Sequence, residues 1–255
     1  MKKRVVLVTG ACGGIGQAVA RIFAKARSTQ KIVLTDHINK AKSLLSLVSE
    51  LNGKAAYFNC DITSNSEIEL VLKTYLPQPP KIDVLINVAG IASVKMAPLV
   101  KTDLEAARKI MDVNFWGTAG LCKAAVSLMQ ANGYGRIINI ASISASMPDP
   151  GNIIYSASKA AVVQLTRGLA KEATYNKVDP SRPLDITVNA VAPGIVDTDM
   201  ANLLSGKMVE GFKAAAPLGR LIRPEEVAKI IFYLASDDAR AITGTVVRID
   251  GGFLA

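Results

Sequence analysis

The sequence predicts a doubly wound α/β fold, in which helices cover both faces of a mostly parallel sheet. Short apolar runs rich in Val, Ile and Leu alternate with longer Ala-rich and Leu-rich segments along the 255 residues. Regular alternation of strands and helices is typical of parallel sheets built from βαβ units. Polar residues or glycines follow several of the expected strands, at the sheet edge where such folds bind their ligands.

Seven strands and the helices between them follow from this pattern and from residues that break it. Prolines at 77, 79 and 80 end the third helix, and Pro224 with Glu225 begins the last one. We expect strands at residues 4–9, 31–35, 55–60, 82–87, 136–141, 186–191 and 245–249, and helices at 17–27, 39–51, 66–75, 102–131, 154–173 and from 224 onward.

Composition indicates one soluble domain formed by residues 1–255, because 50% hydrophobic residues can bury a large core. No apolar run approaches the roughly 20 residues that span a bilayer, and the start reaches Gly10 before a signal-peptide core forms. Cys12, Cys60 and Cys122 contain no C-x-x-C pair, so we expect neither a disulfide framework nor a metal site. A cytoplasmic protein without a membrane partner is expected.

The formal net charge of +9 can attract anionic substrates, carrier proteins or nucleic acid. The Lys and Arg residues form no run of five, and aromatic residues are only 5% of the chain. Because no stacking platform is visible, we expect no nucleic-acid partner.

The glycine turn after the first strand has the order of a diphosphate site. Gly10, Gly14 and Gly16 stand between that strand and the next helix, where free N–H groups and the helix dipole favour an anion. Glycine allows a tight turn and close approach of backbone to phosphate. The spacing differs from the common G-x-G-x-x-G, and such a turn can also be purely steric.

Asp36 ends the second strand, twenty residues after Gly16. A carboxylate there can accept hydrogen bonds from the adenosine ribose, and its charge repels a 2′-phosphate, so NAD is favoured over NADP. The alternative is that Asp36 caps the following helix. His37, the only histidine, is expected to be a loop residue.

Tyr155 and Lys159 lie four residues apart in an expected helix, so their side chains share one face. No other tyrosine of the six has a lysine four residues later. Lowering the phenol pKa from about 10 to about 7 requires roughly 4 kcal/mol, more than an exposed pair supplies. We therefore expect a partly buried site with a second positive charge; the alternative is an incidental pair on a surface helix.

Three further features complete the pattern. Asn114 lies in the middle of an expected helix and predicts a bend there, and Ser142 follows the fifth strand. Residues 199–218 are interpreted as a lid. We expect the substrate pocket to be lined by residues 144–153, by the segment after Pro193 and by apolar lid residues: Met200, Leu203, Leu204, Met208 and Phe212. These apolar residues favour a largely nonpolar substrate; the alternative is that they pack against the protein.

Together these residues resemble the short-chain dehydrogenase/reductase family along nearly the whole chain. The motifs are, in order, Thr9-Gly10-x-x-x-Gly14-x-Gly16, Asp61, Asn87-x-Ala89-Gly90, Asn114, Ser142, Tyr155-x-x-x-Lys159, Pro193-Gly194 and Asp250-Gly251-Gly252. The resemblance implies a Rossmann-like fold with about seven parallel strands. Two departures are Val88, where a second Asn is common, and a longer link at residues 175–184.

The resemblance also implies a catalytic tetrad. Tyr155 would be the acid or base, Ser142 would hold the substrate oxygen, and Asn114 would hold a water linked to Lys159. Lys159 would bind the nicotinamide ribose and lower the tyrosine pKa together with the positive nicotinamide, and Thr198 would contact the carboxamide. The implied cofactor contacts are Gly10, Gly14, Ile15, Gly16, Asp36, Asp61, Ile62, Asn87, Ala89, Gly90, Tyr155, Lys159, Pro193, Gly194, Val196 and Thr198.

The expected function is NAD(H)-dependent hydride transfer to or from a secondary alcohol or ketone. A reductase of 3-oxoacyl thioesters on acyl carrier protein or coenzyme A is the alternative, favoured by the basic charge and disfavoured by Asp36. A non-catalytic dinucleotide sensor is a third possibility, which loss of a tetrad residue would indicate; none is lost. Relatives usually form homotetramers or homodimers through the helices that carry Asn114 and Tyr155.

Overall fold

The protein is built around one seven-stranded parallel sheet with the strand order β3-β2-β1-β4-β5-β6-β7. This computed structural model describes residues 3–51, 53–92 and 96–255. The prediction of a doubly wound, Rossmann-like fold is confirmed. The strands are β1 (Arg4–Thr9), β2 (Thr29–Asp36), β3 (Ala55–Asn59), β4 (Val84–Asn87), β5 (Tyr134–Ile140), β6 (Asp185–Pro193) and β7 (Val246–Ile249).

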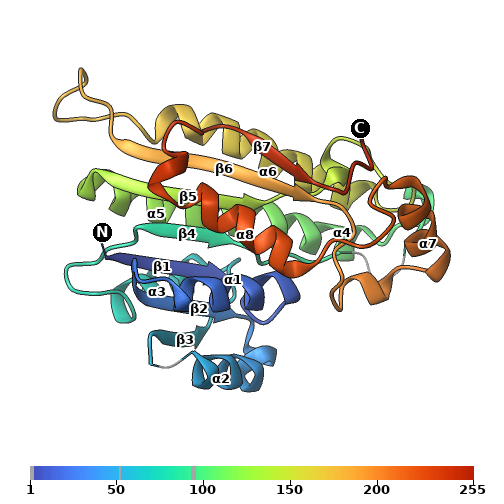
Figure 1. Cartoon of the computed structure of the whole chain (residues 1–255), viewed down its shortest axis with the longest axis horizontal. Helices are drawn as coiled ribbons and strands as arrows, with labels where there is room; N and C mark the ends of the chain where they lie inside the picture. The colour runs from blue at the N-terminus through green and yellow to red at the C-terminus, as the bar shows by residue number, and fades with distance from the viewer. Residues whose placement is uncertain (1–2, 52, 93–95) are drawn as a thin grey trace.

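Helices cover both faces of the sheet because its strands are apolar on both sides. Val6 and Val8 of β1 belong to a core with α1, α2 and α8, whereas Val5 and Leu7 face a second core with α3, α5 and α6. Figure 1 shows α1 and α8 crossing the near face. The helices are α1 (Gly14–Lys25), α2 (Ala41–Glu50), α3 (Asn65–Thr74), α4 (Leu104–Met111), α5 (Thr118–Asn132), α6 (Ile153–Glu172), α7 (Gly206–Ala215) and α8 (Pro224–Leu234).

Several boundaries differ from the predictions because tertiary pairing sets them. β2 begins two residues early, at Thr29, where it pairs with Arg4 of β1. The single helix expected over residues 102–131 is divided into α4, a π-helical turn (Asp112–Gly117) and α5. The expected bend at Asn114 is therefore a widened turn, a feature common at functional sites.

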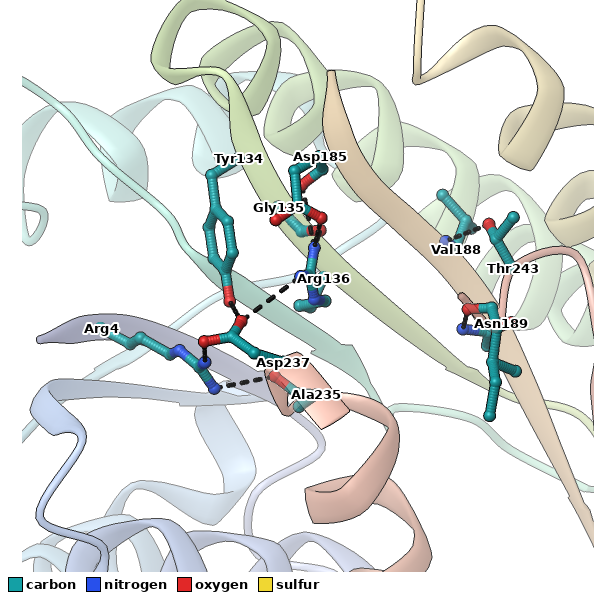
Figure 2. A network of polar contacts seen from close by, with 11 residues as sticks. Arg4, Tyr134, Gly135, Arg136, Asp185, Val188, Asn189, Ala235, Asp237 and Thr243 are labelled. Carbon is teal, nitrogen blue, oxygen red and sulfur yellow. Dashed lines mark hydrogen bonds and ion pairs between the residues drawn. The ribbon is translucent and has the colours of Figure 1, made fainter. Parts of the chain in front are cut away.

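An ionic network around the buried Arg136 joins several strands at their amino-terminal ends (Figure 2). Arg136 of β5 is fully buried, and its guanidinium lies 2.8 Å from Asp185 Oδ1 and 3.4 Å from Asp237 Oδ1. Asp237 also accepts a hydrogen bond from the Tyr134 hydroxyl, and its Oδ2 forms an ion pair with the Arg4 guanidinium at 2.7 Å. The network joins β1, β5 and β6 to the segment after α8, at the end of the strands opposite the glycine turn.

A second set of polar contacts in Figure 2 holds β6 against the chain before β7. The Asn189 side chain donates to the Ile242 carbonyl at 2.7 Å and accepts from the Thr245 N–H at 3.2 Å. The Val188 N–H donates to the Thr243 hydroxyl. These bonds fix β6, whose carboxyl end carries Pro193 toward the candidate site.

The segment interpreted as a lid consists of a short 3₁₀ turn (Ala201–Leu203) and α7, which lies beyond the carboxyl ends of the strands (Figure 1). Phe212 follows the alternative that an apolar lid residue packs against the protein: it is 4% exposed and stacks on Phe253, with ring centroids 4.9 Å apart. Burial of this apolar ring anchors the helix to the body of the protein. No helix in the described ranges is long and apolar enough to cross a membrane.

Candidate active site

Loops at the carboxyl ends of β1 and β4 meet in close backbone contact. Gly10 has φ +61°, and a Cβ placed on it would lie 2.6 Å from the Ala89 nitrogen. The Ala89 N–H in turn donates to the Thr9 hydroxyl at 3.2 Å. Glycine is required at position 10 for both conformation and space, so the turn predicted from the sequence forms here.

The turn at the start of α1 could hold an anion such as a diphosphate. Gly13, which precedes α1, provides no side-chain cap, and the first turn of α1 contains no acidic residue. Because no side chain caps them, the N–H groups in the first turn of α1 can donate hydrogen bonds to an anion. A Cβ on Gly16 would collide with the Gly10 carbonyl, and one on Gly14 would collide with Thr198, which leaves no space for side chains in this cradle.

Asp36 lies beside this turn. Its carboxylate accepts hydrogen bonds from the Cys12 N–H at 2.9 Å and from the His37 N–H at 2.8 Å. The next 3₁₀ turn (Ile38–Lys40) is capped by His37, whose Nδ1 accepts from the Asn39 N–H. The alternative that Asp36 caps the following helix is therefore wrong, and His37 is a loop residue as expected.

Asp61 and Ile62 follow β3. Asp61 Oδ1 accepts from both the N–H and the hydroxyl of Thr63, at 2.9 and 2.7 Å. Burial acts to raise the pKa of Asp61, but these bonds and the charges of His37 and Lys109 bring the net pKa below its usual value. The Ile62 side chain fills the space beside Gly117, where a Cβ would lie 2.7 Å from Ile62 Cδ1.

Asn87 directs its amide into the protein rather than toward the glycine turn. Its Nδ2 donates to Asn139 Oδ1 at 2.9 Å and to the Cys122 sulfur at 3.4 Å, and Asn139 donates to the Thr166 hydroxyl at 3.0 Å. Asn87 Oδ1 is buried without a hydrogen-bond donor among the described residues. This supporting network was not predicted from the sequence, although Asn139 in the apolar β5 run was a signal for it.

Two pairs of tetrad residues meet: Asn114 with Lys159 beside Gly90, and Ser142 with Tyr155, which lies one turn before Lys159 on α6. Lys159 is 4% exposed, and its Nζ donates to the Ile140 carbonyl at 2.9 Å. A Cβ on Gly90 would lie 3.1 Å from Asn114 Oδ1 and 3.2 Å from Lys159 Nζ. Ser142 caps the short turn after β5 and is close enough to Tyr155 for a hydrogen bond between the two side chains.

Asn114 is held by the backbone of a neighbouring loop. Its Oδ1 accepts from the Ile91 N–H at 2.8 Å, and its Nδ2 donates to the Ile91 carbonyl at 2.9 Å and to the Ser158 hydroxyl at 3.0 Å. The Thr118 hydroxyl bonds the Asn114 carbonyl within the π-helical turn. Asn114 therefore joins the loop after β4 to the helix of Tyr155, a contact that the sequence did not reveal.

The residues after β6 return to the glycine turn. The Gly194 N–H donates to the Ile249 carbonyl, and Val196 is buried and pairs with Ile222. Thr198, whose hydroxyl donates to the Val196 carbonyl at 3.3 Å, packs on Gly14. The predicted contacts after Pro193 and in the first turn thus lie on one surface.

Metal ligands do not gather at this surface: within the described part of the chain, no group of three or more His, Cys, Asp or Glu side chains could hold an ion. The three cysteines are free thiols, and burial is the largest cause of the raised pKa of Cys12, Cys60 and Cys122, each to about 12.

Comparison with known proteins identifies the family. A family model described as enoyl-(acyl carrier protein) reductase matches residues 10–254. The 3-oxoacyl-[acyl-carrier-protein] reductase FabG of Thermotoga maritima is 36% identical over 257 residues, which cover 100% of this chain and 99% of that protein. The chain is a short-chain dehydrogenase/reductase.

Other members of the short-chain dehydrogenase/reductase family differ in the substrates that their names give. The cis-4-hydroxycyclohexanecarboxylate dehydrogenase of Sinomonas cyclohexanicum is also 36% identical, with 99% of this chain and 97% of that protein covered. The solved structure of ElxO with NADP bound has a TM-score of 0.86 and 33% identity, and covers 100% of this chain and 99% of that one. The protein is thus an oxidoreductase that acts on CH–OH or ketone groups.

Burial dominates the electrostatics of Tyr155 and Lys159 in this short-chain dehydrogenase/reductase. Burial raises the pKa of Tyr155 to about 12, although the hydrogen bond with Ser142 acts in the opposite direction. Burial also lowers the pKa of Lys159 to about 8. The Lys159 Nζ lies 5.8 Å from the centre of the Tyr155 ring and bonds Ile140 instead. Protein groups alone therefore do not lower the Tyr155 pKa, and a further positive charge is required.

Proposed function

We propose that the protein transfers a hydride between NAD(H) and a secondary alcohol or ketone. The observation that carries this proposal is the contact of Ser142 with Tyr155, one helical turn from Lys159, which meets Asn114 at Gly90 beside the glycine turn. This arrangement supports proton transfer and cofactor binding at the same end of the sheet strands.

The protein residues supply proton transfer and orientation. When bound, the dinucleotide supplies the hydride acceptor or donor and, in its oxidised form, a positive charge. The Ser142 hydroxyl holds the substrate oxygen, and Tyr155 takes the hydroxyl proton during oxidation and returns it during reduction. Lys159 donates one hydrogen bond to Ile140, which leaves two N–H donors for the nicotinamide ribose.

The other assigned contacts follow the fold. The uncapped start of α1, with Gly10, Gly14, Ile15 and Gly16, would hold the diphosphate. Contacts toward the adenosine end would come from Asp36, Asp61 and Ile62. Ala89 would contribute beside Gly10, and contacts toward the nicotinamide end would come from Gly90, which lies against Lys159, and from Pro193, Gly194, Val196 and Thr198. Asn87 would contribute from the inner side of the site, through its buried Oδ1.

Asp36 supports NAD rather than NADP for this chain, although the similar ElxO was solved with NADP. The carboxylate is held beside the glycine turn by the Cys12 N–H. It would accept hydrogen bonds from the ribose hydroxyls and repel a phosphate at the 2′ position.

A direct assay tests the proposal. Purified protein is given NAD or NADP with a panel of secondary alcohols, and the reduced cofactors with the matching ketones, while nicotinamide absorbance is followed. We expect turnover, with NAD(H) preferred. If neither cofactor supports turnover while both still bind, hydride transfer is ruled out and the non-catalytic dinucleotide sensor becomes the better description.

A second candidate is reduction of a 3-oxoacyl thioester on acyl carrier protein or coenzyme A. It is supported by the name of the Thermotoga maritima relative and by the net charge of +9, which suits an acidic carrier. The test compares an acetoacetyl thioester with an uncharged ketone of similar size, each with NADH and NADPH. A kcat/KM at least tenfold higher for the thioester would make it the better assignment.

Assembly and location are also proposals. Exposed apolar side chains on and near α4 and the π-helical turn, namely Val100, Leu104 and Trp116, support a homotetramer or homodimer formed through this face. We further infer one catalytic domain over residues 1–255, a lid at residues 199–218 and a cytoplasmic location, where free thiols stay reduced. Light scattering of the purified protein tests the assembly.

A further inference from the structure

A serine and a carboxylate extend the hydrogen bonding of Ser142. Ser142 Oγ accepts from the Ser144 N–H at 3.1 Å and donates to Ser144 Oγ at 3.2 Å. Ser144 Oγ donates to Asp149 Oδ2 at 2.7 Å. Both serines are buried, so the two hydroxyls and the carboxylate form one directed chain that begins at the proposed substrate-holding group.

Asp149 is fixed to the helix that carries Tyr155. Its N–H donates to the Ser156 hydroxyl at 3.3 Å, and its carbonyl accepts from the Asn152 N–H at 3.0 Å. Ser156 and Asn152 belong to the beginning of α6. The carboxylate therefore keeps its place relative to Tyr155 and Ser142.

The carboxylate also determines which way the hydroxyl protons point. Because an ionised carboxylate only accepts hydrogen bonds, the Ser144 hydroxyl donates to Asp149 and not to Ser142. Ser142 Oγ then keeps a lone pair for the Tyr155 hydroxyl, while its own hydrogen can turn from Ser144 to a substrate oxygen. A donor prepared in this way lowers the cost of orienting it during the reaction.

Two charged groups act near the Tyr155 ring. Lys159 comes from the next turn of α6, with Nζ 5.8 Å from the ring centre. Asp149 comes from the loop before α6. Burial is the largest cause of the raised pKa of Tyr155, and the negative charge of Asp149 also raises it. The π-helical turn that packs on α6 presents the uncharged Asn114 at this point.

We propose that Ser144 and Asp149 are positioning residues for the reaction proposed above: they orient the Ser142 hydroxyl, and Asp149 places a negative charge beside Tyr155. The inference rests on the proposed function for its kinetic part. Its electrostatic part concerns the protein alone.

The kinetic test uses Ser144→Ala, Ser144→Thr and Asp149→Asn, with the exposed Asp238→Asn as a matched control. Ser144→Ala should lower kcat about tenfold, the value of one neutral hydrogen bond, with little change in KM. Ser144→Thr keeps the hydroxyl and should restore most of the loss. Asp149→Asn should shift the pH profile of kcat/KM toward acid by about one unit, because removing the charge favours the phenolate. Asp238→Asn should shift nothing.

The electrostatic test needs no turnover. Carbon-13 NMR of labelled tyrosine rings follows the ionisation of Tyr155, whose resonance is assigned by its loss in Tyr155→Phe. Titration should occur at lower pH in Asp149→Asn than in the wild type. Absence of hydride transfer in the wild type would refute the proposed function, whereas this titration would still decide the role of Asp149.

Two results would overturn the inference. One is an unchanged Tyr155 titration in a folded Asp149→Asn variant. The other is an equal loss of kcat in Ser144→Ala and Ser144→Thr accompanied by a lower melting temperature in both, which would show that Ser144 only maintains the loop.

Discussion

The Lys159 Nζ donates a 2.9 Å hydrogen bond to the carbonyl oxygen of Ile140, at the end of β5. The ammonium is thereby held by the sheet backbone rather than by the Tyr155 hydroxyl. This arrangement fixes a buried charge at the carboxyl ends of the strands, and its burial has a cost that can be measured.

Replacement of Lys159 by Met should stabilise the protein near neutral pH and abolish turnover. Burial lowers the Lys159 pKa to about 8, so the folded state binds fewer protons than the unfolded state between that pH and the ordinary lysine pKa. Burying the charged Lys159 therefore lowers the free energy of unfolding by its full amount below about pH 8, and this loss disappears as pH rises toward 10. Removing it should add roughly 1–3 kcal/mol to the free energy of unfolding, measured by urea denaturation without cofactor. A gain that does not shrink toward pH 10 would contradict this origin.

Gly90→Ala should reduce kcat at least tenfold while the fold is retained. The new Cβ would lie 3.1 Å from Asn114 Oδ1 and 3.2 Å from Lys159 Nζ, displacing both. Gly168→Ala is the matched control: it lies in α6 with open space around it and should add about 0.5–1 kcal/mol of stability without affecting kcat. Steady-state kinetics and thermal unfolding of both variants make the comparison; normal kcat in Gly90→Ala would mean that the geometry at Gly90 is unimportant.

Asp36→Ala should weaken NAD binding and reduce the discrimination against NADP about tenfold or more, because the ribose acceptor and the repulsive charge are both lost. Isothermal titration with each cofactor measures the two affinities separately. Asp238→Asn, remote from the turn in sequence and exposed, controls for net charge. If the ratio of the two affinities stays unchanged in Asp36→Ala, the carboxylate has no part in cofactor choice.

Arg136→Ala should lower the free energy of unfolding by about 2–3 kcal/mol, because it removes a fully buried side chain together with its hydrogen bonds to the Gly135 and Asp185 carbonyls. Its partners Asp185 and Asp237 would lose their cation. The exposed Arg182→Ala, which breaks only a surface pair with Asp179, should change stability by less than about 1 kcal/mol. Because the Arg136 network lies at the amino-terminal ends of the strands and the candidate site lies at their carboxyl ends, kcat should not change in either variant. A large loss of kcat in folded Arg136→Ala would show that the two ends of the sheet strands are coupled.

Much of the fold was predictable because its signals are local. Each strand is an apolar run ended by a breaker or a polar residue, and the pairing of Tyr155 with Lys159 follows from helical periodicity alone. The glycine turn was predictable for the same reason, since Gly10 and Gly16 have steric roles that only glycine can fill.

Features that depend on distant partners could not be predicted. The widened turn at Asn114 reflects its bonds to Ile91, 23 positions earlier in the chain. Partial burial of Tyr155 was expected, but the size of its effect on the Tyr155 pKa depends on the packing of the folded chain. Ser and Asp are common in loops, so Ser144 and Asp149 do not stand out in the sequence. Only the folded loop brings them to Ser142.

The most direct test measures NAD-linked turnover and NAD binding side by side in the wild type and in Tyr155→Phe. Loss of a positioned acid or base typically costs 10²–10⁴-fold in rate, so Tyr155→Phe should bind NAD with nearly unchanged affinity while its kcat falls about a thousandfold. A Tyr155→Phe enzyme that retains full turnover would contradict the assignment of proton transfer to Tyr155.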